Sequence, residues 1–193
     1  PIYFLGCAFL SGAAATIFFT HMAYVLRGKK VPEHVFESIQ SAGKVLLLML
    51  ILISVSLFWK MASYFVGGTL AGRTAAEALI YGPLAKQFWI FEIGVGLMVP
   101  ILLLIVTRLR SIFFLSTCSL FALIGMFFAR LNQVVAGQIV PEIFGQDQAI
   151  SFVTYTPSIW EWLIIAAALG LAGLAFVQGE RYFGARFMEI KAH

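Results

Sequence analysis

Two neighbouring hydrophobic stretches carry side chains that could exchange protons or bind a polar ligand. Residues 87–107 include Glu92, and residues 111–137 include Arg130 and Asn132. The connection between them is short, so if both cross a membrane they run antiparallel, and the start of one lies beside the end of the other. Glu92 and Arg130 are therefore expected at similar depth near one membrane face, where a carboxylate beside a base can transfer protons.

Two more ionisable residues, Lys60 and Glu161, fall in the same layer when depth is measured by the helical rise of about 1.5 Å per residue. Charged side chains inside a membrane are costly and usually face a partner or a polar cavity. The sequence therefore predicts a polar pocket for a ligand or protons, with the candidate residues Glu92, Arg130, Lys60, Asn132 and Glu161. Two simpler interpretations stay open: Glu92 could pair with a base only to hold helices together, and Lys60 could extend to the membrane surface.

The composition places the chain in a membrane. Hydrophobic residues make up 61% of it and charged residues 11%, and the mean hydropathy is +0.95. A water-soluble domain of this size could not bury so much apolar surface. A membrane-spanning helix needs roughly 20 apolar residues, so we expect an all-α integral membrane protein in which residues 1–193 form a single bundle of five transmembrane helices. The windows are residues 2–26, 45–66, 87–107, 111–137 and 158–179.

The net charge of +4 is distributed unevenly over the connections. The first and third connections and the C-terminal tail together hold nine Lys and Arg residues, whereas the second connection holds two and the fourth none. Basic connections stay in the cytoplasm, so the N-terminus is expected outside and the C-terminus inside. The charge thus indicates topology and contact with anionic membrane lipid rather than nucleic acid.

No motif of a soluble enzyme is present: the chain lacks a P-loop, a Gly-rich dinucleotide motif, a CxxC cluster and an HExxH. Only His21 lies inside a span, whereas haem between membrane helices commonly needs two His ligands. Cys7 and Cys118 fall within apolar spans, where a thiol behaves as a small buried hydrophobe. We therefore expect no haem, metal or iron–sulfur cluster in this chain.

Two connections are expected to contain short helices. In the first, Pro32 suits a first helical turn and Gly43 suggests a break, which together predict a separate helix on the cytoplasmic surface. In the second, Thr74 followed by Glu77 has the form of a capping box and predicts the start of a brief outer helix.

Small residues predict where helices approach one another closely. In the third span, Gly94, Gly96 and Pro100 indicate a bend or a close neighbour. Small-residue stripes in the first and last spans are expected to face other helices. These stripes contain Gly12, Ala15, Gly170 and Gly173.

Three segments carry a resemblance to a known family: the opening PIYFLGCAFLSGAAA, the run FWIFEIGVGLMVP, and ARLNQVVAGQ leading into YTPSIWEWLI. In their order and spacing they resemble the membrane subunits of polysulfide and nitrite reductases (NrfD-like). The resemblance is strongest to the later five spans of the ten-span form found in quinone-reducing uptake hydrogenases. The chain begins at Pro1 without an initiator Met, and we expect it to be the later half of a longer subunit.

The resemblance implies a multi-pass subunit of a bacterial or archaeal cytoplasmic membrane, in a respiratory electron-transport complex. Such a subunit is not catalytic alone. It passes electrons between membrane quinone, menaquinone or ubiquinone, and an iron–sulfur protein on the outer face, beside a larger catalytic redox subunit, sometimes with proton translocation. Glu92, Arg130 and Lys60 match polar positions of the family. Two alternatives are a transporter or proton-channel element and a purely structural membrane anchor.

The predicted topology is tested by cysteine labelling of intact cells. A cysteine introduced at Ala149, in the fourth connection, should react with a membrane-impermeant reagent because that connection is expected outside. A cysteine at Ala192, in the tail, should react only after the membrane is permeabilised. The reverse pattern would contradict the predicted orientation.

Overall fold

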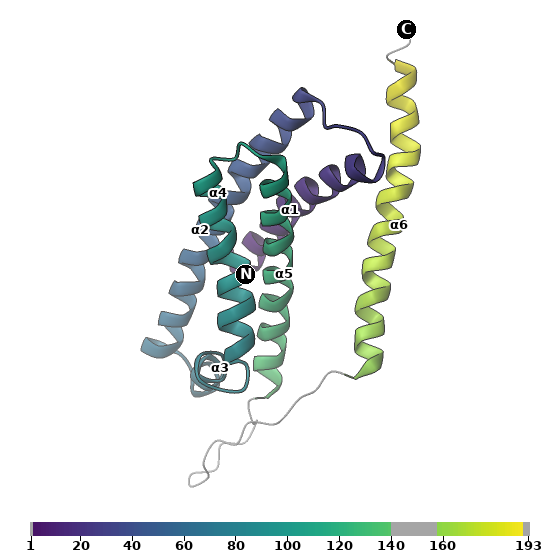
Figure 1. Cartoon of the computed structure of the whole chain (residues 1–193). Coiled ribbons are helices and arrows are strands. Elements are labelled where there is room, and N and C mark those ends of the chain that lie inside the picture. Colours follow the sequence, from purple (N-terminus) through teal and green to yellow (C-terminus); the bar gives the residue numbers. More distant parts are fainter. Residues whose placement is uncertain (1, 140–157, 191–193) are drawn as a thin grey trace. The chain divides into compact units, whose positions relative to one another are not determined.

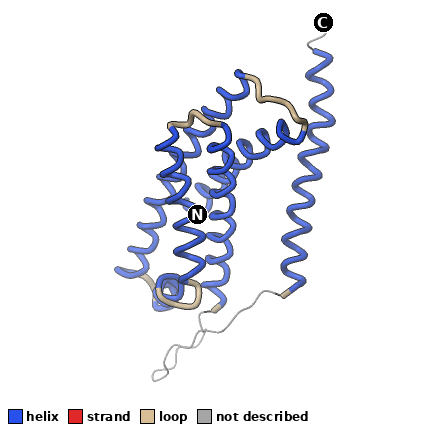
Figure 2. The backbone as a smooth tube through the Cα atoms, viewed as in Figure 1, coloured by secondary structure: helices blue, strands red, loops and turns tan. Residues whose placement is uncertain are grey.

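The computed structural model describes residues 2–139 and 158–190, which form helices joined by short loops, with no strand among them (Figures 1 and 2). Within these residues, five helical segments are long and apolar enough to cross a membrane. This confirms the expected all-helical fold with five candidate spans, while their orientation stays a prediction. The elements are α1 (Ile2–Leu26), α2 (Glu33–Gly67), α3 (Leu70–Ile80), η1 (Gln87–Met98), α4 (Val99–Thr107), α5 (Ile112–Gln138) and α6 (Ile159–Ile190).

The chain divides into two compact units, residues 1–153 and residues 154–193. The first unit contains the helices from α1 to α5, with α3 at the end of the bundle where α2 ends and η1 begins (Figure 1). The second unit contains α6. Each unit is described by itself, and the expectation of a single five-helix bundle stays a prediction. The fourth connection and the extreme tail, which carry both labelling positions, lie outside the described residues.

Helix α1 packs against α2 and α5 through one face. The residues of that face, Cys7, Leu10, Ala14 and Ile17, recur at helical spacing and are each at most 3% exposed. The expectation that Gly12 faces a helix is wrong within the first unit, because Gly12 is exposed and a Cβ there would meet nothing within 4 Å. The small residues form a continuous run around the helix, so their presence alone does not select the packed face.

Helix α2 is continuous from Glu33, so the predicted separate surface helix with a break at Gly43 is wrong. Its 35 residues span about 50 Å, which exceeds the roughly 30 Å hydrocarbon core. Gly43 is buried, and a Cβ there would lie 2.5 Å from a side-chain carbon of Leu115 in α5. A single glycine costs a helix only about 1 kcal/mol, and here it gives α5 room to pack.

Helix α3 begins one turn earlier than the sequence suggested. Thr69 is its N-cap, and the Thr69 hydroxyl accepts a hydrogen bond from the Gly72 N–H at 3.2 Å. The predicted capping box is therefore wrong. Thr74 lies buried inside the helix and donates to the carbonyl one turn before it, and Glu77 instead pairs with Arg73 at 3.2 Å.

The third span is irregular where its sequence predicted a bend or a close neighbour. It begins as the π-helix η1 and becomes the α-helix α4 at Val99, whose N–H donates to the carbonyl of Gly94. Pro100 lies in the first turn of α4, the part of a helix that tolerates a residue without an N–H. The close neighbour is α5, because a Cβ on Gly96 would lie 2.5 Å from the Cα of Gly125.

Helices η1 and α5 run antiparallel, as their short connection required. Besides the glycine contact, the rings of Phe91 and Phe128 stack with centroids 4.3 Å apart. Phe91 pairs with Phe128, and the later residue Gly96 pairs with the earlier residue Gly125, so the two helices run in opposite directions. The start of η1 therefore lies beside the end of α5, which is the arrangement predicted for Glu92 and the residues around Arg130.

Helix α6 has 32 residues, and Ile159–Gly179 forms its candidate span. At its start the Ser158 N–H donates a hydrogen bond to the Glu161 carboxylate at 3.2 Å, which satisfies one of the free amide groups of a helix N-terminus. The predicted packing of Gly170 and Gly173 against other helices stays a prediction.

The contact between η1 and α5 predicts a difference between two glycines of the same helix. Gly125→Ala should lower stability by about 1–3 kcal/mol, because the new methyl group overlaps the backbone of Gly96. Gly137→Ala should be neutral or stabilising, because its methyl group meets nothing within 4 Å and alanine favours the helix. Thermal unfolding midpoints of the purified variants measure the difference, and equal midpoints would contradict the close approach.

Candidate functional site

A buried hydrogen bond joins Glu92 of η1 to Asn132 of α5. The Asn132 Nδ2 donates to the Glu92 Oε2 at 2.8 Å. Glu92 is 4% exposed and Asn132 is 1% exposed, so neither reaches the surface of the first unit. Among the described residues no donor is paired with the second polar atom of the amide, the Asn132 Oδ1.

Tyr3 of α1 and Lys60 of α2 extend this polar cluster. The Tyr3 phenol lies near Glu92 and interacts with it electrostatically. The Lys60 ammonium lies 4.9 Å from the centroid of the Tyr3 ring and interacts electrostatically with Glu92. Three helices thus bring polar side chains to Glu92, in addition to the one that carries it.

Arg130, the predicted partner of Glu92, takes a different position. Its side chain is exposed, with the guanidinium carbon 4.6 Å from the centroid of the Phe4 ring. Within residues 2–139 no ion pair joins Arg130 to Glu92, so the acid is held by an amide instead. Glu161 belongs to the second unit, where its carboxylate accepts the hydrogen bond at the start of α6.

Tyr3 and Phe4 were missed by the sequence analysis, although both lie at the same end of the bundle as Lys60, Glu92 and Arg130. The depth argument counted only ionisable side chains. Applied to phenol and aromatic groups near the start of α1, the same argument would have placed both residues in this layer.

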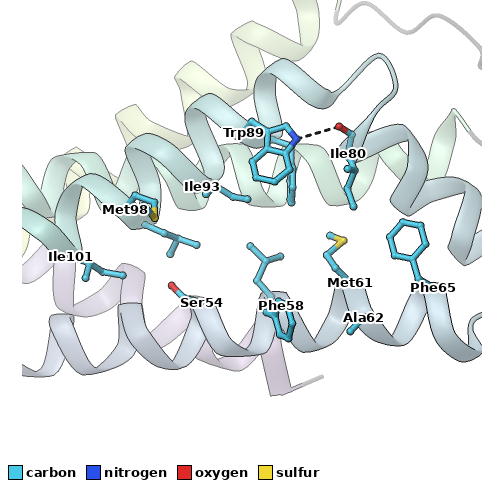
Figure 3. Close-up of a pocket in the computed structure, with 13 residues that line it drawn as sticks. Ser54, Phe58, Met61, Ala62, Phe65, Ile80, Trp89, Ile93, Met98 and Ile101 are labelled. Atoms are coloured by element: carbon cyan, nitrogen blue, oxygen red, sulfur yellow. Dashed lines mark hydrogen bonds between the residues drawn. The ribbon is translucent and has the colours of Figure 1, made fainter.

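An apolar groove of about 500 Å³ lies between α2 and the third span (Figure 3). Its two hydrogen-bonding side chains are already paired within the protein: Ser54 donates to the Leu50 carbonyl at 2.8 Å, and Trp89 Nε1 donates to the Ile80 carbonyl at 3.2 Å. None of the five predicted site residues lines the groove. Its lining consists of Ser54, Leu57, Phe58, Met61, Ala62, Phe65, Ile80, Phe88, Trp89, Ile93, Leu97, Met98 and Ile101.

Metal-binding side chains do not gather in the part of the chain that the structure describes. There, no group of three or more His, Cys, Asp or Glu residues could hold a metal ion. Cys7 and Cys118 are buried free thiols on α1 and α5.

Comparison with protein families gives a match over residues 1–142 to the family described as polysulphide reductase, NrfD. The chain belongs to the NrfD polysulphide reductase family. One subunit of the selenate reductase of Mesobacillus selenatarsenatis is 23% identical over 184 residues, which cover 92% of this chain and 40% of that protein. The NrfD-family chain therefore spans less than half the length of this relative. No solved structure matches it significantly.

The family match covers the first unit from α1 to α5, and with it Tyr3, Lys60, Glu92, Arg130 and Asn132. Together with the five candidate spans, it identifies a multi-pass protein of a prokaryotic membrane. The expected family is thereby confirmed at the level of the NrfD membrane subunits.

A double-mutant cycle tests whether Glu92 and Asn132 of this NrfD-family chain stabilise each other. Glu92→Leu leaves the buried amide without its acceptor and should cost about 1–3 kcal/mol, and Asn132→Leu should cost a similar amount. The double variant should be more stable than the sum of the two costs predicts, because it leaves neither group unpaired.

Thermal unfolding of the purified proteins gives the three values. Gln133→Leu, at an exposed position of the same helix, is the control and should change stability by less than about 0.5 kcal/mol. Strictly additive costs in the cycle would show that the two side chains are not coupled.

Proposed function

We propose that this NrfD-family chain is the quinone-interacting membrane subunit of a multi-subunit iron–sulfur oxidoreductase. The observation that carries the proposal is the buried Glu92 carboxylate, hydrogen-bonded to Asn132 inside an apolar bundle. Oxidation of a quinol releases two protons with its two electrons, and reduction of a quinone takes them up. A group that exchanges protons within the membrane is therefore what this chemistry requires, and an intramembrane acid is costly enough to indicate a functional site.

The groove beside α2 supports the proposal because membrane quinones carry a long apolar tail. Its lining is hydrocarbon, aromatic and thioether, and no polar group in it lacks a partner, so it fits a tail but not the quinone ring. Lys60 and Glu92 directly precede Met61 and Ile93, which line the groove. The helices that carry the polar groups thus also form the surface that suits the tail.

The roles of the side chains follow from their positions. Glu92 accepts or donates a proton at its carboxylate. Asn132 orients that carboxylate through its hydrogen bond, and Tyr3 adds a polar neighbour. Lys60, and Arg130 from the edge of the cluster, supply positive charge that stabilises a developing quinone anion.

The partners belong to the same proposal. We infer an iron–sulfur protein docked at the end of the bundle that carries α3, which the predicted topology puts outside, and a larger catalytic redox subunit beyond it. The name of the selenate reductase relative describes a subunit of a reductase. Since the chain covers 40% of that protein, we further propose that it is the later part of a longer subunit, as in the ten-span form of the uptake hydrogenases.

Quinone-linked turnover of the intact complex tests this function. Glu92→Gln keeps the size and the hydrogen-bonding capacity of the side chain but cannot ionise, so turnover should fall about 100-fold or more. Glu37→Gln removes an exposed carboxylate near the start of α2, at the opposite end of the bundle from α3, and it should leave turnover unchanged.

Assembly must be verified in each variant by its intact subunit ratio. Normal turnover in a fully assembled Glu92→Gln complex would reject the proton role and leave a structural pair. Proton or solute flux in liposomes without any redox partner would instead favour a channel or transporter element.

A further inference from the structure

The amide oxygen of Asn132, Oδ1, is buried and accepts no hydrogen bond from the described residues. Asn132 is 1% exposed, and its Nδ2 donates to Glu92. Buried acceptors are nearly always paired. An orphan beside a carboxyl group therefore indicates a donor that is present in another state of the protein.

The charged and titratable side chains around Glu92 have other partners. Tyr3 interacts with Glu92 and Cys7, and the Lys60 ammonium lies over the Tyr3 ring. Arg130 lies over the ring of Phe4. On α3, Arg73 and Glu77 pair with each other, and α4 carries no ionisable residue. A proton on Glu92 itself would place a donor next to the Asn132 Oδ1, since the two side chains are already in hydrogen-bond contact.

We propose that Asn132 is the hydrogen-bond partner of the proton that Glu92 carries. When the carboxylate takes one proton, from a quinol hydroxyl or from water, one of its oxygens becomes an O–H donor and its charge goes from −1 to zero. That O–H donates to the Asn132 Oδ1, while the Nδ2 continues to donate to the other carboxyl oxygen. A protonated acid and an amide each offer one donor and one acceptor, so the pair closes two hydrogen bonds where the ionised acid closes one.

This inference rests on the proposed function only in taking Glu92 as the group that holds a proton. Asn132 then acts as a positioning residue that offers a donor to the ionised acid and an acceptor to the neutral acid. The amide can therefore pair with the acid in either state, which allows the site both to load a proton and to release it.

Infrared difference spectroscopy of the intact complex, between alkaline and acidic buffer, tests the inference without requiring turnover. Acidification should produce the C=O stretch of a protonated carboxylic acid that disappears in Glu92→Gln. In Asn132→Leu the band should move to higher frequency, because the acid has lost its hydrogen-bond partner. Asn132→Ser keeps one oxygen acceptor and should give a smaller displacement. Gln133→Leu makes the same kind of change at an exposed position of α5 and should leave the band in place.

The wild-type complex gives a second reading that needs no variant at Asn132. Asn132 is the sole asparagine of the 193 residues, and its amide C=O stretch should shift together with the acid band, as shown by ¹³C-asparagine labelling. A missing Glu92-dependent band, an unmoved band in assembled Asn132→Leu or Asn132→Ser, or an unresponsive asparagine carbonyl would each overturn the inference. Turnover measured on the same samples reports separately on the proposed function: normal turnover in Glu92→Gln with the expected spectra would reject that function and retain the Asn132 pairing.

Discussion

The close approach of η1 and α5 at Gly96 and Gly125 determines where the polar groups of the first unit can meet. Between membrane helices, lipid supplies no hydrophobic drive, so packing of small residues must hold the backbones together. With no side chain on either glycine, the two backbones come into direct contact. This crossing brings the short side chain of Asn132 within 2.8 Å of Glu92. A wider separation would place an isolated acid in an apolar interior, at a high cost in free energy.

The third span separates two chemical environments. Glu92 meets the polar cluster of α1, α2 and α5, whereas Ile93 lines an apolar groove that contains no unpaired donor or acceptor. A π-helical segment is a common feature of functional sites, because the wider turn changes which side chains share a face. In η1 the regular α-helix resumes only at Val99, next to Pro100. The irregular part of the span is therefore the part that carries both the acid and the groove.

The spans and the antiparallel pairing of η1 with α5 could be predicted from the sequence, because both depend on one-dimensional quantities: the length of hydrophobic runs and the length of a connection. Hydrophobic run length gave all five candidate spans, and the short connection placed Glu92 beside the end of α5. Which side of a helix faces its neighbour could not be predicted in the same way. The π-helix shifts the faces of η1, and the run of small residues in α1 offers the same signal in every direction. The sequence likewise left open whether Glu92 pairs with Arg130 or Lys60, whereas Asn132, two residues after Arg130 on α5, makes the hydrogen bond.

The replacement of a base by an amide beside Glu92 changes what the acid can do. An arginine in direct contact would favour the charged form of a carboxylate strongly, and the pair would then act mainly as a fixed link between helices. An amide has no charge, and it offers a donor to the ionised acid and an acceptor to the protonated acid. With Lys60 acting from beyond the Tyr3 ring, positive charge still acts on the acid without forming a closed ion pair. A buried acid with these neighbours suits reversible protonation better than permanent pairing. For this physical reason we regard the polar cluster around Glu92 as part of the proposed quinone chemistry and not only as a contact between spans.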